Sequence, residues 1–158
     1  MFGLFKSVAF SDPLLGELVR ARGAWRGTLQ LDSGPTKLVL TGPRAAPDPA
    51  ALAAARELKA QLPSWRSAIQ TALFEHYAPY AQAVEEGEYP ETEASFPTIV
   101  VPNDVWQHVS LTFISIAPLG GVLTTELGYL TAWDEEHTLG ARFVDGSFVE
   151  LNGSVLPP

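Results

Sequence analysis

One polar segment near the C-terminal end contains most of the side chains that could do chemistry. It reads Trp133-Asp134-Glu135-Glu136-His137 and places three carboxylates next to an imidazole. Carboxylate and imidazole groups can bind a divalent metal ion, and a glutamate paired with a histidine can transfer protons. This segment, called the 133–137 corner below, is therefore the first candidate for a functional site.

The spacing within the 133–137 corner restricts that chemistry. Neighbouring residues of an extended chain point to opposite faces, so we expect only alternate residues to converge. The two pairs that alternation allows are Glu135 with His137 and Asp134 with Glu136. A metal site would need one more ligand from elsewhere in the chain, and the sequence offers two further histidines: His76 and His108.

A structural role is the interpretation that we favour for the 133–137 corner. In this interpretation His137 bonds a neighbouring carboxylate or backbone group, and Trp133 anchors the loop in the core. The spacings of zinc proteases, calcium loops, phosphate-binding loops and serine hydrolases are absent from the sequence. We therefore expect no catalytic residue and no cofactor, with a metal-binding or hydrolytic enzyme that uses this corner as the alternative.

Charge is distributed unevenly along the chain. Residues 1–66 contain nine of the ten Lys and Arg residues against five Asp and Glu, a balance of +4. Residues 67–158 contain only Arg142 against thirteen acidic residues, a balance of −12, and the two balances add to the net charge of −8. The most acidic stretch, residues 85–93, includes Gly and Pro, which predicts a loop. We expect this loop to bind a partner through five glutamates: Glu85, Glu86, Glu88, Glu91 and Glu93.

The acidic charge also indicates the class of partner and the compartment. A negative field repels phosphate backbones and attracts cationic proteins, so we expect a basic protein partner and no nucleic acid. The chain has no cysteine, and its longest apolar stretch, residues 111–123, is interrupted by Ser115, Pro118 and two glycines. We therefore expect a cytoplasmic protein that does not enter the membrane.

The elements that must position these residues begin with a small sheet. Residues 15–20 and 25–31 alternate in polarity and are separated by Gly23, which marks a turn. Residues 32–35 contain dense turn chemistry and precede a third extended segment over residues 37–41. These patterns predict an N-terminal antiparallel β-meander.

Helices are predicted for the middle of the chain. Asp48 can cap the free N–H groups of a helix whose first turn contains Pro49, so we expect a helix over residues 50–61. A second helix should start at Pro63, and Pro79 should kink or end it near residue 78. An apolar stripe on the second helix should pack on the sheet: Trp65, Ile69, Leu73 and Tyr77.

The C-terminal third predicts a second antiparallel sheet of about five strands. Extended segments are expected at residues 96–101, 105–116 and 122–132. Asp145-Gly146 lies between two short apolar segments, residues 139–143 and 148–151, and predicts a hairpin with a type I′ turn. The order of strands, two central helices and strands favours a single α+β domain over residues 1–158.

The 133–137 corner, continued by Thr138-Leu139-Gly140 and later by Val149-Glu150, resembles that of a family of uncharacterised bacterial domains. Their corner is similar to W-x-x-E-H-G-x-G, and the present chain differs at Thr138, where the family usually has Gly. The N-terminal segments 16–18 and 25–27 resemble the pattern with which those domains open. The resemblance implies an α+β domain that acts as an immunity or interaction protein, and it implies no established activity.

Overall fold

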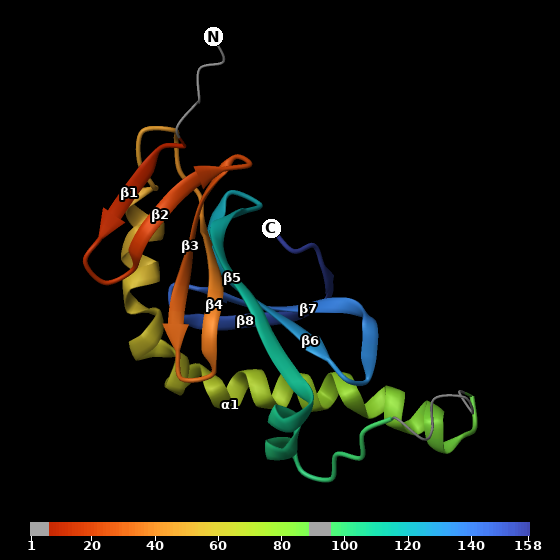
Figure 1. Cartoon of the computed structure of the whole chain (residues 1–158). Helices are drawn as coiled ribbons and strands as arrows, with labels where there is room; N and C mark the ends of the chain where they lie inside the picture. The colour runs from red at the N-terminus through yellow and green to blue at the C-terminus, as the bar shows by residue number, and fades with distance from the viewer. Residues whose placement is uncertain (1–6, 89–95) are drawn as a thin grey trace.

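The computed structural model describes residues 7–88 and 96–158, and its framework is one eight-stranded sheet (Figure 1). The strands lie side by side in chain order, and every neighbouring pair is antiparallel except β4 and β5, which are parallel. The strands are β1 (Ala9–Asp12), β2 (Gly16–Ala21), β3 (Ala24–Leu31), β4 (Gly34–Leu40), β5 (Val109–Leu119), β6 (Val122–Thr131), β7 (Asp134–Val144) and β8 (Ser147–Val155).

The predicted N-terminal meander is confirmed, with β1 as an additional edge strand. Arg22 and Gly23 both have positive φ angles, 50° and 79°, in the tight turn between β2 and β3. The separate C-terminal sheet that we expected is wrong, because β4 pairs with β5 and joins all eight strands in one sheet. The chain is therefore a mixed α/β protein whose sheet is mostly antiparallel.

One long helix, α1 (Pro49–Glu85), takes the place of the two predicted helices. Its start is as predicted, because the Asp48 side chain accepts a hydrogen bond from the N–H of Ala51 at 3.0 Å. Pro63 and Pro79 both lie inside the helix. Proline removes one helical hydrogen bond and favours a bend, and Figure 1 shows that the yellow first part of α1 and the green second part run in different directions. Of the two outcomes expected at Pro79, a kink or an end of the helix, the end does not occur, because α1 continues to Glu85.

The second part of α1 packs its apolar stripe on the sheet. The predicted residues Trp65, Ile69, Leu73 and Tyr77 are all buried. They belong to the same core cluster as buried residues of β5, β6 and β7, among them Ile114, Leu127 and Phe143. The spacing of apolar residues therefore identified the packed face of the helix correctly.

The segment before β5 differs from the prediction. Residues 97–100 form no strand, and a 3-10 helix, η1 (Pro102–His108), occupies the start of the predicted strand 105–116. Pro102 favours the first turn of a helix, since it lacks the N–H group that would otherwise be unpaired. The final hairpin is confirmed, with φ angles of 49° at Asp145 and 77° at Gly146, and its strands extend beyond the predicted bounds.

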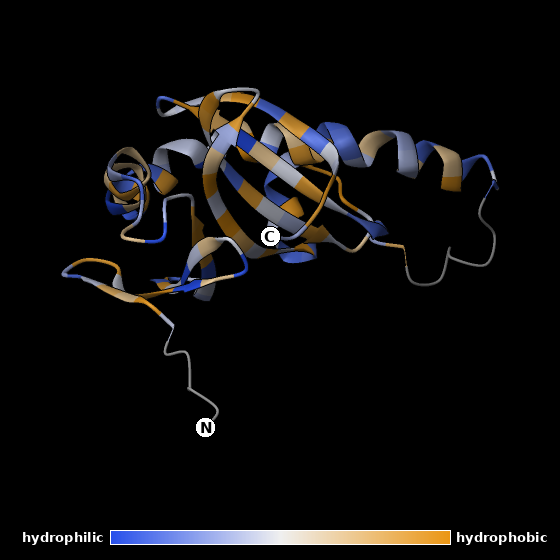
Figure 2. Cartoon of the chain, turned by 90° about the horizontal axis from the view of Figure 1, so that it is seen from above, coloured by the Kyte–Doolittle hydropathy of each residue, from blue (hydrophilic) through white to orange (hydrophobic). Residues whose placement is uncertain are grey.

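Polar and apolar residues alternate along the strands and around α1, as Figure 2 shows. This is the pattern of elements that bury one face and expose the other. Within residues 7–88 and 96–158, no helix combines the length and the apolar character needed to cross a membrane.

Candidate functional site

The 133–137 corner lies at the tight turn between β6 and β7. Trp133 and Asp134 are buried, with 5% and 7% of their surface exposed. The N–H of Asp134 donates to Oγ1 of Thr131 at 3.2 Å, which closes the turn. Trp133 therefore anchors this turn in the core, as our structural interpretation expected.

Asp134 is the centre of a hydrogen-bonded group. The hydroxyl of Tyr80, from the last part of α1, donates to Oδ2 of Asp134 at 2.8 Å. Nδ1 of His137 lies 2.9 Å from Oδ1 and 3.0 Å from Oδ2 of the same carboxylate. Burial alone would raise the pKa of Asp134, but the hydrogen bonds from Tyr80 and His137 outweigh it and lower that pKa below its usual value.

His76 extends this group toward the core. The indole N–H of Trp133 donates to Nδ1 of His76 at 3.0 Å, so Nδ1 carries no proton and a neutral ring has its proton on Nε2. The ring centroids of His76 and Tyr80 are 5.3 Å apart. Burial lowers the pKa of His76, and the charge of nearby Asp134 only partly opposes this effect. The imidazole therefore resists protonation.

The structure brings together Asp134 and His137, which is not one of the pairs that alternation allowed. The N–H of His137 donates to Oδ1 of Asp134 at 3.3 Å, so the start of β7 curls around the carboxylate instead of running fully extended. Glu135 and Glu136 point to solvent and join neither Asp134 nor His137 in a hydrogen bond or ion pair among the described residues. The limit that we set from strict alternation, which allowed at most Glu135 with His137 or Asp134 with Glu136 to converge, is therefore wrong.

Sequence reasoning missed Tyr80 and underrated His76. The spacing of four residues places both on one face of a continuous helix, but we expected Pro79 to kink or end the helix just before Tyr80. Within the described parts of the chain, no three His, Asp or Glu side chains are grouped so that they could hold a metal ion. The group can instead hold the imidazole of His137 in a fixed orientation, which is the geometry of a histidine that acts as a general base.

The predicted acidic loop is only partly described. Glu85 is the last residue of α1, and Glu86 and Glu88 follow it in a turn where all three are exposed. Glu91 and Glu93 lie outside the described residues. The helix thus continues into a segment that we expected to be a loop, because the residues that break helices, Gly87 and Pro90, come after Glu85.

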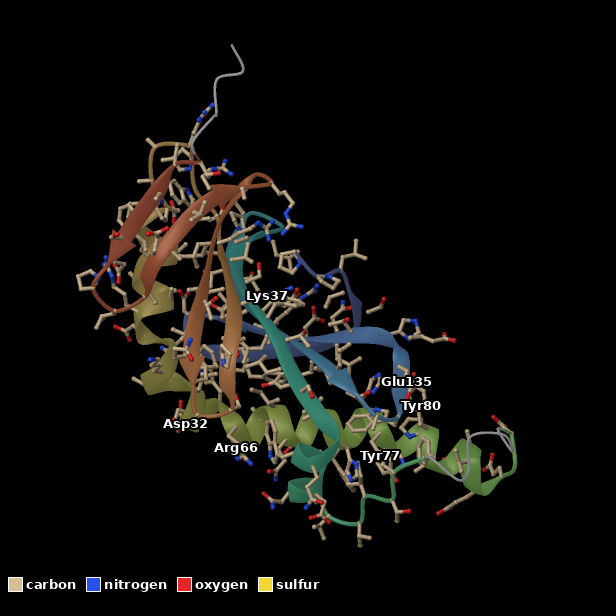
Figure 3. The ribbon with its side chains drawn as sticks, in the orientation of Figure 1. Asp32, Lys37, Arg66, Tyr77, Tyr80 and Glu135 are labelled. Atoms are coloured by element: carbon tan, nitrogen blue, oxygen red, sulfur yellow. The ribbon has the colours of Figure 1, made fainter. Side chains whose placement is uncertain are left out.

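The glutamates at the C-terminal end of α1 and just after it, and those of the 133–137 corner, lie at one end of the molecule. The bond from Tyr80 to Asp134 holds the β6–β7 turn against the last part of α1, and Figure 3 shows the labelled Tyr80 and Glu135 at that end. We call this surface the acidic end and define it by five residues: Glu85, Glu86, Glu88, Glu135 and Glu136. None of the five forms an ion pair with a described residue.

Arginines gather on the N-terminal strands instead. A cavity of about 370 Å³ is lined by Arg20, Arg22 and Arg44, which form no ion pair with the described residues. Burial, followed by the charge of Arg22, lowers the pKa of Arg26 beside this cavity. The positive charge balance of residues 1–66 and the negative charge balance of residues 67–158 therefore also appear as separate surfaces of the folded molecule.

Protonation of His76 should destabilise the fold. The pKa of His76 is lower in the folded chain than the value of about 6.5 for an unfolded chain, so the unfolded state binds the proton more readily. The free energy of unfolding should therefore fall as the pH drops below about 6.5. His76→Asn, which keeps an acceptor for Trp133 but does not titrate, should remove this part of the pH dependence.

This prediction is checked by urea denaturation at a series of pH values between about pH 8 and pH 5, the range in which histidine titrates. His108→Asn is the matched control, because His108 lies at the end of η1 and, among the described residues, no hydrogen bond or ring contact joins it to His76. An identical pH dependence in the wild type and in His76→Asn would show that His76 does not cause it.

Comparison with protein families identifies a match over most of the chain. A family model described as a domain of unknown function (DUF6985) matches residues 15–155, which extend from the start of β2 to the end of β8. No curated protein and no solved structure matches the chain.

Proposed function

The chain belongs to the family described as a domain of unknown function (DUF6985), and from this premise we propose that it is a non-enzymatic module that binds a basic protein partner. Membership confirms the expected resemblance to a domain family without an assigned activity. The finer parts of the proposal are an immunity-type role, in which the module neutralises a basic toxin or effector domain, and a location in the bacterial cytoplasm.

The observation that carries this proposal is the unpaired charge of the acidic end. Two glutamates elsewhere in the described chain do have a cation: Arg142 donates to Glu126 at 2.7 Å and to Glu150 at 2.8 Å. The five glutamates of the acidic end have no such cation among the described residues. Like charges held close together repel one another, and a basic partner would relieve that repulsion.

Exposed apolar residues beside the second part of α1 supply the second part of an interface. Val100 and Val101 are 76% and 49% exposed. They follow Ile99, whose N–H donates to the hydroxyl of Tyr77 at 3.1 Å, so they lie beside the second part of α1. Protein interfaces combine an apolar centre with a polar rim. The valines and the glutamates fit these two roles.

Charge at such a surface mainly affects how fast the partner associates and which partner is selected. Complementary charge accelerates encounter and disfavours partners of the same sign, while the apolar contacts hold the complex together. Binding through the acidic end should therefore weaken as the salt concentration rises, because salt screens exposed charges.

Reversing charge at the acidic end should abolish binding of the partner. The variant Glu85→Lys/Glu88→Lys changes two exposed side chains and should leave stability within about 0.5 kcal/mol of the wild type. We expect affinity capture from a lysate of the cells that encode the protein, followed by mass spectrometry, to retain one basic protein on the wild type and not on this variant. High salt should also release that protein.

The matched control is Glu17→Lys/Glu57→Lys, which reverses the same number of exposed carboxylates on β2 and on the first part of α1. This control should capture the partner as the wild type does. A partner that both double variants retain equally, at low and at high salt, would refute recognition through the acidic end.

The geometry of Asp134 and His137 favours a second candidate, a hydrolytic enzyme. Asp134 orients the His137 ring through Nδ1, which leaves Nε2 for proton transfer, and 44% of the His137 side chain is exposed. His137→Asn distinguishes the two functions, since it removes a general base without changing the acidic end. Loss of an ester-hydrolysing activity with this variant would favour the enzyme, and unchanged capture of a basic protein would favour the binding module.

A further inference from the structure

A cleft of about 560 Å³ is lined by residues of the β3–β4 hairpin, α1 and the segment from η1 to β6, and none of them belongs to the acidic end. Its walls come from the tip of the β3–β4 hairpin, the bend of α1 and the adjoining parts of η1, β5 and β6. Figure 3 shows Asp32 from the hairpin and Arg66 from α1 next to each other at this edge. A cavity of this size is in the range of sites for small molecules.

The inner wall of the cleft is apolar and aromatic. Trp106 and Tyr129 are packed edge to face with their ring centroids 6.3 Å apart. The indole N–H of Trp106 donates to Oε1 of Gln70 at 2.8 Å, which fixes the orientation of that ring. Leu111, which pairs with Tyr129 across β5 and β6, and Ile69 of α1 complete this wall. Rigid aromatic walls favour a flat apolar ligand.

Tyr129 contributes a hydroxyl without a protein partner. The residue is 5% exposed, lines the cleft and forms no hydrogen bond with the described residues through its side chain. Burial raises the pKa of Tyr129 far above its usual value, although the charge of Arg66 opposes this, so the hydroxyl keeps its proton. Among the described residues, Nε of Arg20 is the only fully buried side-chain polar atom without a partner, so the Tyr129 hydroxyl reaches the open space of the cleft. A polar atom of a bound ligand can therefore accept a hydrogen bond from it.

Two cations stand at the mouth of the cleft. The guanidinium of Arg66 lies 4.2 Å from the centroid of the Trp106 ring, and Lys59 lines the same opening from the turn of α1 before Pro63. Neither cation forms an ion pair with a described residue, and the only acidic residue that lines the cleft is Asp32. The net charge of the mouth is therefore positive, in a protein whose net charge is −8.

We propose that this cleft binds a small aromatic carboxylate, either as a free acid or as the C-terminal residue of a peptide. The aromatic body lies against Trp106 and Tyr129, and the carboxylate is held by Arg66 and Lys59. A guanidinium already fixed on an indole ring loses little freedom when it binds a carboxylate. This inference is independent of the proposed partner, because the cleft contains no residue of the acidic end.

Isothermal titration calorimetry with indole-3-propionate tests the proposal, with indole-3-propionamide as the uncharged probe of the same shape. We expect the acid to bind and the amide to bind at least about tenfold more weakly, since a charge-assisted bond contributes roughly this factor. Lys59→Gln/Arg66→Gln should weaken binding of the acid to the level of the amide. Tyr129→Phe tests the hydroxyl, and a melting midpoint shows that this variant is folded.

Lys37→Gln is the matched control, because Lys37 is an exposed cation on β4 that does not line the cleft (Figure 3). It should bind indole-3-propionate as the wild type does. The tripeptide Ala-Ala-Trp, with a free or an amidated C-terminus, distinguishes a peptide ligand from a free acid. Tighter binding of the tripeptide with the free C-terminus supports a peptide C-terminus as the ligand. Binding of indole-3-propionate but not of the tripeptide supports a free acid. No binding of either acid at millimolar concentration, or equal binding of acid and amide, would overturn the proposal.

Discussion

Replacement of Trp65 by alanine is expected to lower the free energy of unfolding by about 3–5 kcal/mol, the usual cost of removing a buried tryptophan. Trp65 is 5% exposed, and its ring stacks on Phe143 of β7 with centroids 3.9 Å apart. Its indole N–H also donates to the carbonyl oxygen of Gly146 at 2.9 Å. One side chain thus joins α1, just beyond its bend, to the β7–β8 hairpin.

Urea denaturation followed by far-ultraviolet circular dichroism measures this effect, since the loss of a tryptophan alters fluorescence directly. Trp65→Phe keeps an aromatic ring against Phe143 but loses the bond to Gly146, so it should cost about 1–2 kcal/mol. Ser67→Ala is the surface control and should change stability by less than about 0.5 kcal/mol. A cost below 1 kcal/mol for Trp65→Ala, with circular dichroism unchanged, would contradict the role given to this contact.

The contacts of Trp65 also show which parts of the fold could be predicted from the sequence. The spacing of Trp65, Ile69, Leu73 and Tyr77 identified the packed face of α1, and Asp145-Gly146 identified the last turn. Both are local signals, in which residues a few positions apart determine the structure. That Trp65 bonds Gly146 could not be predicted, because 81 residues separate them and nothing in either segment indicates the other.

The same limit explains the errors at the level of the sheet. β4 and β5 are parallel neighbours, and the whole of α1 and η1 lies between them in the chain. No turn residue can indicate a pairing over that distance, so the sequence patterns indicated two sheets where the structure has one. At Pro63 the sequence predicted a break between two helices where the structure has one helix. Proline is a strong local signal for a helix boundary, but buried residues on both sides of it, Leu58 and Trp65, keep the helix continuous.

The candidate site was predicted in its location but not in its contacts. The 133–137 corner was identified because polar residues of the required types are adjacent in the sequence. The pairing of Asp134 with His137, and the contribution of Tyr80, depend on how β7 curls and on the continuation of α1 past Pro79. Tertiary packing decides both features. The cleft beside Trp106 and Tyr129 is of the same kind, since its walls come from three separate parts of the chain: the β3–β4 hairpin, α1 and the consecutive elements η1, β5 and β6.

Asp12 is a further residue that only the structure reveals, and its replacement by alanine should cost about 2–4 kcal/mol. Its buried carboxylate accepts hydrogen bonds from the N–H groups of Leu14 and Leu15 at 2.9 and 3.0 Å in the turn between β1 and β2. It also accepts a bond from Nε of Arg56 on α1 at 2.8 Å, which ties the N-terminal hairpin to the helix. We expect this loss of stability to be smaller than the loss on breaking a fully buried ion pair, because the Arg56 side chain is 41% exposed.

The stabilisation by Asp12 should depend on pH. The hydrogen bond from Arg56 is the largest cause that lowers the pKa of Asp12, and the N–H groups of Leu14 and Leu15 add to it, while burial opposes them. The unfolded chain therefore binds the proton more readily than the folded chain. The contribution is complete above the unfolded pKa of about 3.9 and is lost as the pH falls through the lower folded pKa.

Urea denaturation at pH values from about 7 down to 2, which spans this titration, measures the effect. Asp12→Asn should make the free energy of unfolding depend less on pH at the lowest pH values of that range. The pH dependence that remains should include the contribution of Asp134, whose pKa is also lowered. Asp32→Asn, an exposed aspartate at the tip of the β3–β4 hairpin, is the matched control and should leave the slope unchanged. If the Asp12→Asn variant were as stable as the wild type at every pH, the charged bond from Arg56 would contribute nothing. The Asp12 carboxylate would then not be what joins the hairpin to α1.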